Sequence, residues 1–270
     1  MNMIGTFERH EKFKSNFITP RHVDVWCPPD YFENIAECYP VIYMHDGQNL
    51  FDSAAAFGGS GWEIHKTISR LMQAKKIPGA LVVGIWNTDI RWREFMPQKT
   101  YWSLALRRHH EAFINTSGGE PVSDAYLRFL VEEVKPFIDS NYRTLSDQPN
   151  TFVMGSSMGG LISLYAISEY PDVFCGAGCL STNWPAGEFE LVHEMAKNLP
   201  DPKTHKLYFD YGTEALDALY GPYQKRMDEY LRNAGYVENT NWITLKFVGA
   251  DHSEKAWRKR VEIPLSFLLS

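Results

Sequence analysis

The stretch that decides the fold is Thr151–Leu161, TFVMGSSMGGL, in which an apolar run enters a serine- and glycine-rich turn and a second apolar run leaves it. Its central five residues, GSSMG, match the pattern G-x-S-x-G with Ser157 in the middle. Ser156 does not fit, because the first glycine position would then fall on Met154. A serine on so tight a strand-to-helix turn needs flanking residues without side chains. The pattern therefore predicts a nucleophile elbow with Ser157 as its nucleophile.

Strand-like apolar runs and helix-period runs alternate along the whole chain, without a linker or an internal repeat between two halves. Strands are expected at 22–28, 39–45, 79–87, 151–155, 173–181, 206–212 and 242–249. Helices are expected at 61–76, 123–142 (capped by Ser123 or Asp124, kinked at Pro136), 159–171, 223–235 and 255–269. Near-continuous apolar strands between helices are typical of a parallel sheet buried on both faces. The sequence predicts one doubly wound α/β domain spanning residues 1–270.

A serine nucleophile needs a histidine base, and in this type of fold the histidine follows the serine in the chain. Three histidines do so: His193 lies in a helix-like run, and His205 precedes a strand at the opposite end of the sheet. His252 lies directly after a predicted strand and before the last helix. We expect His252 to be the base.

The carboxylate that orients the base should come from the segment DYGTEALDALY, residues 210–220. Asp210 lies within the predicted strand and is the poorest candidate. Glu214 and Asp217 both lie in the turn after that strand, and the local pattern does not choose between them.

An oxyanion hole needs two backbone N–H groups. One belongs to the residue after the nucleophile, Met158, and the other to the loop after an earlier strand, where VIYMHDGQNLFD supplies Gln48, with Gly47 as the alternative. Gly47 is also expected to let the chain approach a substrate closely. His45 and Asp46 are expected to fix this loop.

Taken together, these segments resemble the family named “Putative esterase”, which groups esterase D, feruloyl and acetylxylan esterases, enterochelin esterases and mycolyltransferases. The resemblance runs from about Phe17 to Leu269 and rests on VIYMHDGQNLFD, VVGIWNTDIRWREFMP, GSSMGGL, DYGTEALDALY and GADHSEKAW. It implies an α/β-hydrolase fold without a metal or organic cofactor. It also implies Ser157 as nucleophile and His252 as base, with Trp257 as the tryptophan of the family pattern G-x-x-H-x-x-x-x-W. Asp217 heads the run that matches the family's acid, after a two-residue insertion, and Glu214 remains the alternative.

The sequence specifies the substrate contacts less closely than the catalytic residues. Three charged residues after the predicted strand at 79–87 either hold a polar or acidic substrate or fix their loop: Arg91, Arg93 and Glu94. Three aromatic residues in loops after strands are candidates for a sugar or aromatic pocket: Trp102, Trp184 and Tyr220. Among these, Arg93 and Trp184, together with Gly47, are the expected substrate contacts.

Composition excludes several other classes. The chain has 270 residues, 44% hydrophobic content and a formal net charge of -6, and its basic residues come in short clusters balanced by acidic ones, so no nucleic-acid partner is expected. No apolar stretch is long enough for a membrane span, and residues 1–17 lack the apolar core of a leader, which predicts a cytoplasmic protein. Cys175 and Cys179 are expected as buried thiols, and His109, His110 and Glu111 as a solvated helix end with no metal.

The function that this sequence predicts is hydrolysis of short acyl or aryl esters, with carbohydrate-linked esters among the candidates, by a serine esterase whose partner is a small-molecule ester. Alternatives are an acyltransferase of the same fold, a siderophore esterase of the enterochelin type, and a hydrolase-fold binding protein without turnover. A homo-oligomer remains possible.

Overall fold

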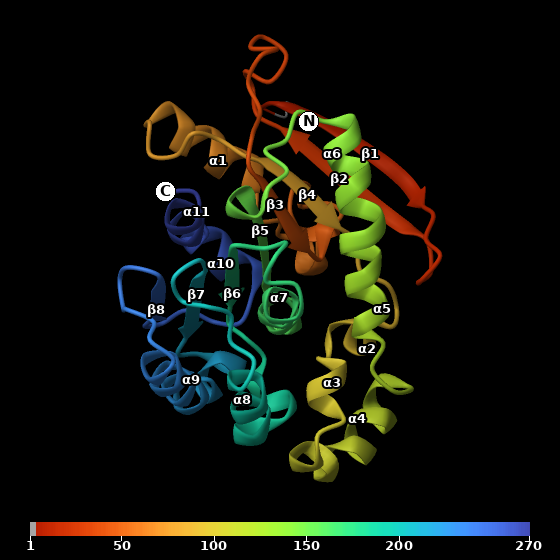
Figure 1. The fold of residues 1–270 in the computed structure, drawn as a ribbon, viewed down its shortest axis with the longest axis vertical. Coiled ribbons are helices and arrows are strands. Elements are labelled where there is room, and N and C mark those ends of the chain that lie inside the picture. Colours follow the sequence, from red (N-terminus) through yellow and green to blue (C-terminus); the bar gives the residue numbers. More distant parts are fainter. Residues whose placement is uncertain (1–3) are drawn as a thin grey trace.

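The computed structural model describes residues 4–270, so the first three residues of the N-terminal stretch considered above lie outside it. The described chain is built around a single sheet of eight strands in the order β1-β2-β4-β3-β5-β6-β7-β8 (Figure 1). The strands are β1 (Thr6–Phe13), β2 (Arg21–Cys27), β3 (Val41–His45), β4 (Leu81–Ile85), β5 (Thr151–Ser156), β6 (Gly176–Leu180), β7 (Lys206–Gly212) and β8 (Trp242–Phe247).

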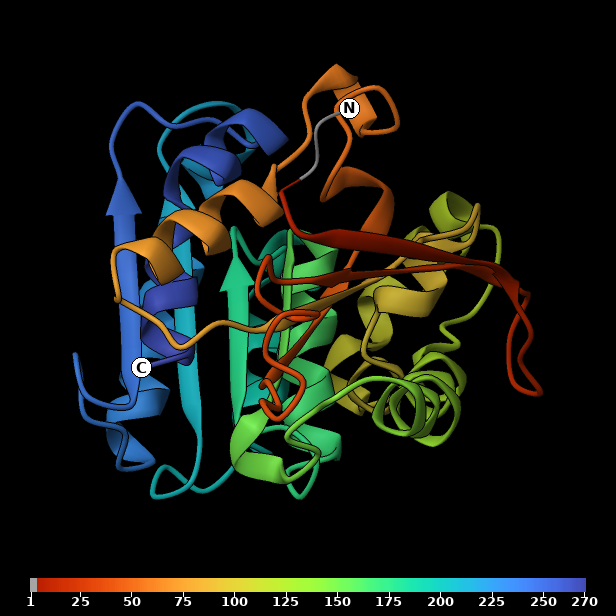
Figure 2. The same cartoon turned by 90° about the horizontal axis from the view of Figure 1, so that it is seen from above.

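The six strands from β4 to β8 run parallel, whereas β2 pairs antiparallel with β4 and β1 antiparallel with β2. The sheet twists strongly, so that β1 and β2 lie across the direction of β6 to β8 (Figure 2). The expected mostly parallel α/β sheet is confirmed. Strand β1 is an addition that the sequence analysis did not foresee.

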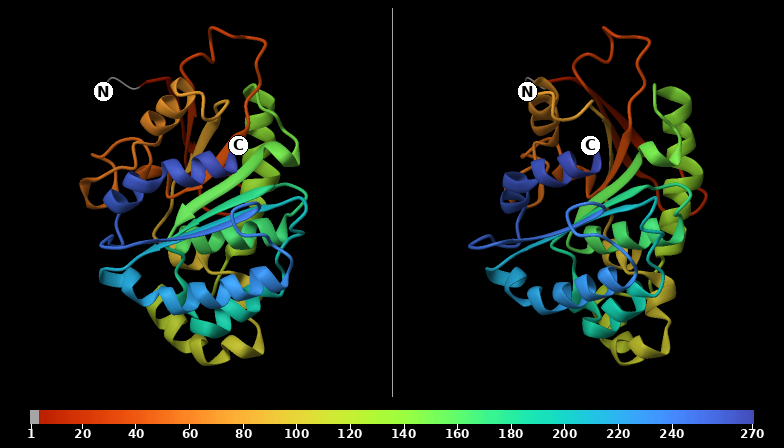
Figure 3. Two further views of the ribbon diagram at one scale, coloured as in Figure 1. Left: turned by 90° about the vertical axis from the view of Figure 1, so that its left-hand side faces the viewer. Right: turned by 60° about the vertical axis from the view of Figure 1, so that its left-hand side comes forward.

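Helices cover both faces of the sheet (Figure 3). They are α1 (Ile64–Gln73), α2 (Arg91–Phe95), α3 (Gln98–Tyr101), α4 (His110–Ser117), α5 (Ser123–Arg128), α6 (Lys135–Asn141), α7 (Met158–Glu169), α8 (Glu188–Ala196), α9 (Gly221–Asn233), α10 (Glu254–Arg260) and α11 (Glu262–Leu268). One face carries α1, α10 and α11, and the other carries α5 to α9 (Figure 3).

Two apolar clusters correspond to these two faces. Along β3, Val41 and Tyr43 belong to one cluster, and Ile42 and Met44 to the other. This alternation is the period of two of a strand whose two sides are both buried. It explains why the strands appear in the sequence as near-continuous apolar runs.

Two expected helices differ in detail. The helix at 123–142 is continuous but contains a π-type segment, Phe129–Val134, directly before Pro136, and its N-cap is Val122 where Ser123 or Asp124 was expected. A wide π turn accommodates the missing proline N–H without breaking the helix. The helix at 255–269 is divided at Val261 into α10 and α11.

Two expectations from composition are met within residues 4–270. No helix there has the length and apolar character that a membrane crossing requires. Cys175 and Cys179 are buried free thiols.

Candidate active site

Ser157 lies between the end of β5 and the start of α7, with φ 58° and ψ −121°. A non-glycine residue rarely adopts this conformation, which costs of order 1–3 kcal/mol. A Cβ on Gly155 would lie 2.7 Å from the carbonyl carbon and oxygen of Gly159, and one on Gly160 would lie 3.1 Å from the carbonyl oxygen of Leu180. The turn is therefore closed by direct backbone packing. The local sequence allows it only because the flanking residues are glycines.

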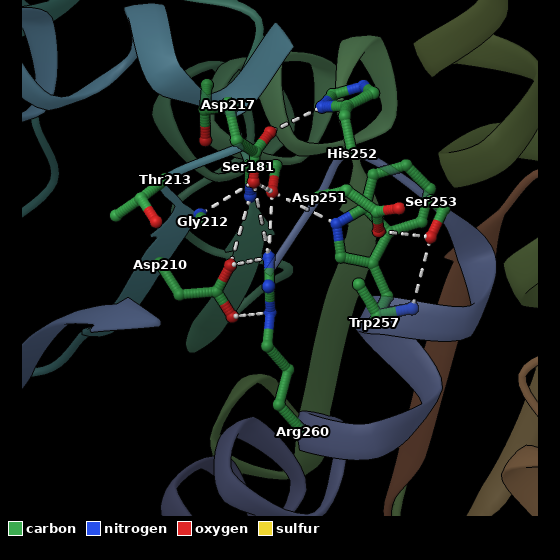
Figure 4. Close-up of polar contacts among 12 residues, drawn as sticks. Ser181, Asp210, Gly212, Thr213, Asp217, Asp251, His252, Ser253, Trp257 and Arg260 are labelled. Carbon is green, nitrogen blue, oxygen red and sulfur yellow. Dashed lines mark hydrogen bonds and ion pairs between the residues drawn. The ribbon is translucent and has the colours of Figure 1, made fainter. Parts of the chain in front are cut away.

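His252 follows β8 and precedes α10, whose N-terminus is capped by the Ser253 hydroxyl accepting from the N–H of Ala256. The Nδ1 atom of His252 lies 2.6 Å from Oδ1 of Asp217, which is fully buried (Figure 4). Glu214 is exposed, and its side chain accepts only from the hydroxyl of Thr213 among the described residues, at 3.4 Å. The structure thus brings Asp217, and not Glu214, to His252.

The second oxygen of Asp217 is also held. The N–H of Gly212 donates to Oδ2 at 2.6 Å, and the hydroxyl of Ser181 donates to it at 2.7 Å. Burial alone would raise the pKa of Asp217, but the hydrogen bonds from His252, Ser181 and Gly212 hold it below its ordinary value. Asp217 is therefore a charged acceptor for the histidine N–H at neutral pH.

A buried polar network lies behind Asp217, and the sequence analysis missed it. The Ser181 hydroxyl accepts from Trp257 Nε1 at 3.0 Å and from Arg260 Nη2 at 2.8 Å, while it donates to Asp217 (Figure 4). Arg260 also donates twice to Asp210, at 2.8 and 3.1 Å. One sequence signal was present: Trp257 and Arg260 are three residues apart on a helix and so share one face.

The loop after β3 forms the opposite wall. Asp46 has left-handed φ 58° and ψ 47° ahead of the short 3₁₀ turn Gly47–Asn49. Both oxygens of Asp46 accept from Arg91 at 2.6 Å, and one also accepts from Asn87 at 2.6 Å. Burial would raise the pKa of Asp46, but Arg91 and then Asn87 hold it below its ordinary value. This agrees with the expectation that Asp46 fixes the loop.

The backbone N–H groups of Gln48 and Met158 are the expected oxyanion donors. Within residues 4–270, neither of them donates to a protein acceptor. The side chain of Gln48 accepts from the N–H of Asn87 at 3.2 Å, which ties this loop to the segment after β4. Gln48 and Ser157 line the same cavity and Met158 follows Ser157, so these two amides remain the expected donors to a developing oxyanion.

A cavity of about 380 Å³ joins these elements. Its walls comprise Asp46, Gln48, Asn49, Phe57, Asn87, Arg91, Trp92, Ser156, Ser157, His252, Glu254 and Trp257. Ser157 and His252 both line it, and among the described residues no hydrogen bond joins their side chains. Catalytic hydrogen bonds are often loose before a substrate binds.

Comparison with known protein families identifies the family to which this chain belongs. The family model described as “Putative esterase” matches residues 15–263, most of the chain. The chain belongs to this esterase family.

Individual relatives agree with this assignment. The Bacillus subtilis protein YbbA is 23% identical to this chain, in an alignment that covers 98% of this chain and 97% of YbbA. The ferri-bacillibactin esterase BesA of Bacillus subtilis is 27% identical, in an alignment that covers 54% of this chain and 49% of BesA. A solved ferulic acid esterase superimposes with TM-score 0.71 and 16% identity, covering 100% of this chain and 99% of its own. At that identity, the superposition shows the α/β-hydrolase fold alone.

The substrate contacts expected from the sequence of this esterase need correction. Trp184 is fully buried, and its indole N–H donates to Gln224 at 3.0 Å. Arg93 does not line the cavity but donates to the carbonyl of Glu120 at 2.8 Å. Gly47 is absent from the lining because it packs on β4, where a Cβ would lie 2.6 Å from the carbonyl carbon of Gly84.

The other candidates each contact protein side chains. Glu94 is buried and accepts from Arg21 at 2.9 Å, and Arg91 lines the cavity but is bound to Asp46. Trp102 packs edge-on against Tyr101, outside the cavity. Tyr220 is buried edge-on against His252, with 5.5 Å between ring centroids. Sequence reasoning missed several polar and aromatic cavity residues, namely Asn49, Phe57, Asn87, Trp92 and Glu254. Glu254, two residues after His252, is the most notable.

Proposed function

We propose that this esterase is a serine carboxylic-ester hydrolase that acts on short acyl or aryl esters, with Ser157 as nucleophile. The observation that carries the proposal is the strained backbone of Ser157 at the floor of a cavity whose wall presents His252, hydrogen-bonded at 2.6 Å to Asp217. Strain of this kind persists where the surrounding structure enforces it, and it exposes the serine hydroxyl at the edge of the sheet.

The reaction proceeds in two balanced steps. Ser157 Oγ attacks the ester carbonyl carbon while His252 Nε2 takes the hydroxyl proton, and the carbonyl π electrons move to oxygen. Collapse of this intermediate breaks the C–O bond to the alcohol, which leaves with the proton from His252. A water molecule then attacks the acyl-enzyme by the same route and releases the acid and free Ser157.

Each supporting group has a defined task in this proposal. Asp217 accepts from Nδ1–H of His252, so that Nε2 is the free acceptor facing the cavity, and its charge stabilises the imidazolium. The amides of Gln48 and Met158 donate to the oxyanion. The volume of about 380 Å³ lies at the small end of ligand pockets, which favours compact substrates.

The test is a panel of p-nitrophenyl esters of increasing acyl length, assayed with the wild type, Ser157→Ala and Ser156→Ala. We expect measurable turnover of short esters, loss of it in Ser157→Ala, and most of it retained in Ser156→Ala. A fluorophosphonate should add one adduct to the wild type and to Ser156→Ala. An adduct on Ser157→Ala, seen by intact mass, would contradict the assignment.

A further inference from the structure

The cavity wall of this esterase contains two carboxylates and one guanidinium: Asp46, Glu254 and Arg91. Asp46 and Arg91 cancel, because Arg91 donates to both oxygens of Asp46 at 2.6 Å. Glu254 has no such partner. The base role proposed for His252 requires a neutral imidazole, and the wall then has a net charge of −1.

No cation among the described residues forms an ion pair with Glu254, although the charge of Arg91 acts on it at longer range. Arg258 lies one helical turn further along α10, the usual position for a helical ion pair, but it lies 3.6 Å from Glu63 instead. Among the described residues, the one side chain that hydrogen-bonds to Glu254 is the neutral amide of Asn49, which donates to Oε1 at 3.3 Å. Glu254 is half-buried, and this burial, followed by the neighbouring charge of Asp46, raises its pKa above the ordinary value.

Aromatic side chains lie on the same cavity wall. Trp92 and Phe57 are 42% and 78% exposed, so their ring faces are available to a ligand. An aromatic face attracts a cation through its quadrupole, and a carboxylate beside it adds a direct charge interaction. A small cavity with both features favours a quaternary or protonated ammonium group over a neutral group of the same shape.

Building on the proposed function, we propose that Glu254 makes the cavity selective for esters with an ammonium group and unfavourable for esters with a carboxylate or phosphate. The cavity is small, so a charged group near the scissile ester lies within a few ångströms of this unpaired carboxylate. At that separation the interaction amounts to about 1.4 kcal/mol, or roughly tenfold in kcat/KM, favouring the cation and disfavouring the anion by similar factors.

The experiment uses p-nitrophenyl esters whose acyl chains are matched in shape and end in trimethylammonium, tert-butyl or carboxylate. A second series places the charge on the alcohol, with choline and 3,3-dimethylbutyl esters of the same acid. Because the pKa of Glu254 is raised, rates are compared on the alkaline side, at about pH 8 and above, for the wild type, Glu254→Gln and Glu254→Asp. Glutamine retains an oxygen that accepts from Asn49 and removes only the charge.

We expect the wild type to prefer the cation over its tert-butyl counterpart by about tenfold in at least one series. Glu254→Gln should abolish that preference, Glu254→Asp should retain most of it, and added salt should weaken it. The control is Glu33→Gln, which removes one exposed carboxylate from the loop between β2 and β3 and should leave the preference unchanged. This loop lies at the N-terminal end of β3, whereas the cavity lies at its C-terminal end.

Two failures are distinguishable. Suppose that the wild type turns over the tert-butyl ester and that Glu254→Gln retains the wild-type ranking of kcat/KM among the cationic, neutral and anionic esters. The inference is then wrong and the proposed function stands. If the wild type shows no charge order at all, the inference is also wrong. If no ester in either series is turned over in a Ser157-dependent manner, the proposed function itself is wrong.

Discussion

Two aspartate–arginine pairs support the walls of the site: Asp46–Arg91 in the cavity wall after β3, and Asp210–Arg260 behind Asp217. Both are two-fold hydrogen-bonded pairs, but the side chain of Arg91 is 23% exposed and that of Arg260 only 3%. Arg91 serves one carboxylate. Arg260 serves two, because its Nη2 lies 2.8 Å from Asp210 and 3.7 Å from Asp217.

The electrostatic balance differs accordingly. The pKa of Asp46 is lowered, because Arg91 and Asn87 outweigh its burial, whereas burial wins at Asp210 and raises its pKa despite Arg260. The first pair fixes a backbone loop at the edge of the cavity. The second pair is buried, and we expect it to hold Asp217 in place against His252.

The largest expected effect concerns the residue that the second pair supports. Asp217→Asn should allow the wrong histidine tautomer and lower kcat by up to ~10⁴-fold. Glu214→Gln, an exposed carboxylate three residues earlier, should change kcat far less. Steady-state kinetics of both variants decide the matter. A reversed order would mean that Glu214 moves to His252 when substrate binds.

The next largest expected effect is on stability, because substitution of the two arginines should lower the free energy of unfolding by different amounts. Arg260→Met leaves Asp210 and Asp217 without their buried cation, and we expect it to lower the free energy of unfolding by about 3–5 kcal/mol. Arg91→Met leaves Asp46 with Asn87 and access to cavity water, so about 1–3 kcal/mol is expected. Urea denaturation measures both.

Arg258→Met is the matched control, since it removes an arginine from the same helix as Arg260. Its pair with Glu63 is partly exposed and weakly stabilising. Equal losses in all three variants would remove the distinction between a sealed pair and an open one.

Ser181 tests whether the sealed network acts on catalysis or only on stability. Ser181→Ala removes the hydroxyl that joins Trp257 and Arg260 to Asp217, and we expect kcat to fall by about tenfold with little change in KM. Ser163→Ala removes an equally buried hydroxyl, which donates to the Gly159 carbonyl within α7, and serves as control. A loss of stability in Ser181→Ala with unchanged kcat would assign Ser181 a purely structural role.

The opposite pKa shifts of Asp46 and Asp210 predict opposite pH dependences. The folded-state pKa of Asp46 is lowered, so its charge stabilises the fold above the ordinary pKa near 4, and that contribution is lost as pH falls through the folded value. The folded-state pKa of Asp210 is raised, so its charge destabilises the fold at neutral pH, and this cost is relieved as pH falls toward the ordinary value.

Urea denaturation of Asp46→Asn and Asp210→Asn from about pH 7 to about pH 3 measures these slopes. The stability difference between wild type and Asp46→Asn should shrink on acidification. The wild type should instead become more stable relative to Asp210→Asn as the pH falls over the same range. Parallel slopes would show that the two carboxylates are electrostatically equivalent.

Local patterns carried most of the fold and part of the site. The elbow was predictable because its glycines are required by contacts a few residues apart, and the parallel strands because both of their faces are apolar. Strand β1 was not, because it is an edge strand whose residues are mostly exposed or half-buried and show no apolar pattern. Asp217 could be preferred over Glu214 only through the family resemblance, since both lie in one turn.

Contacts between distant segments lay beyond local patterns. Ser181, Asp210 and Arg260 come from three different elements, and nothing in the sequence near any one of them indicates the other two. Trp184 shows the converse error: its position in a loop after a strand was read as exposure, but the side chain turns into the core toward Gln224. Loop position predicts which edge of a sheet a residue occupies, and not which way its side chain points.

The smallest expected effect is that of chelation. Within residues 4–270, His109, Glu188 and Glu190 are the one group of three side chains whose ligand atoms lie close enough to share a metal ion. Arg108 already pairs with both glutamates, at 2.6 and 3.0 Å, and none of the three residues lines the cavity. The carboxylates of Asp46 and Asp210 are instead balanced within the protein by Arg91 and Arg260. Incubation with EDTA should therefore leave kcat/KM for a neutral ester unchanged, and Glu188→Gln should do the same. Loss of activity on chelation that zinc or calcium restores would mean that a metal, and not these two arginines, supplies the positive charge on which the site depends.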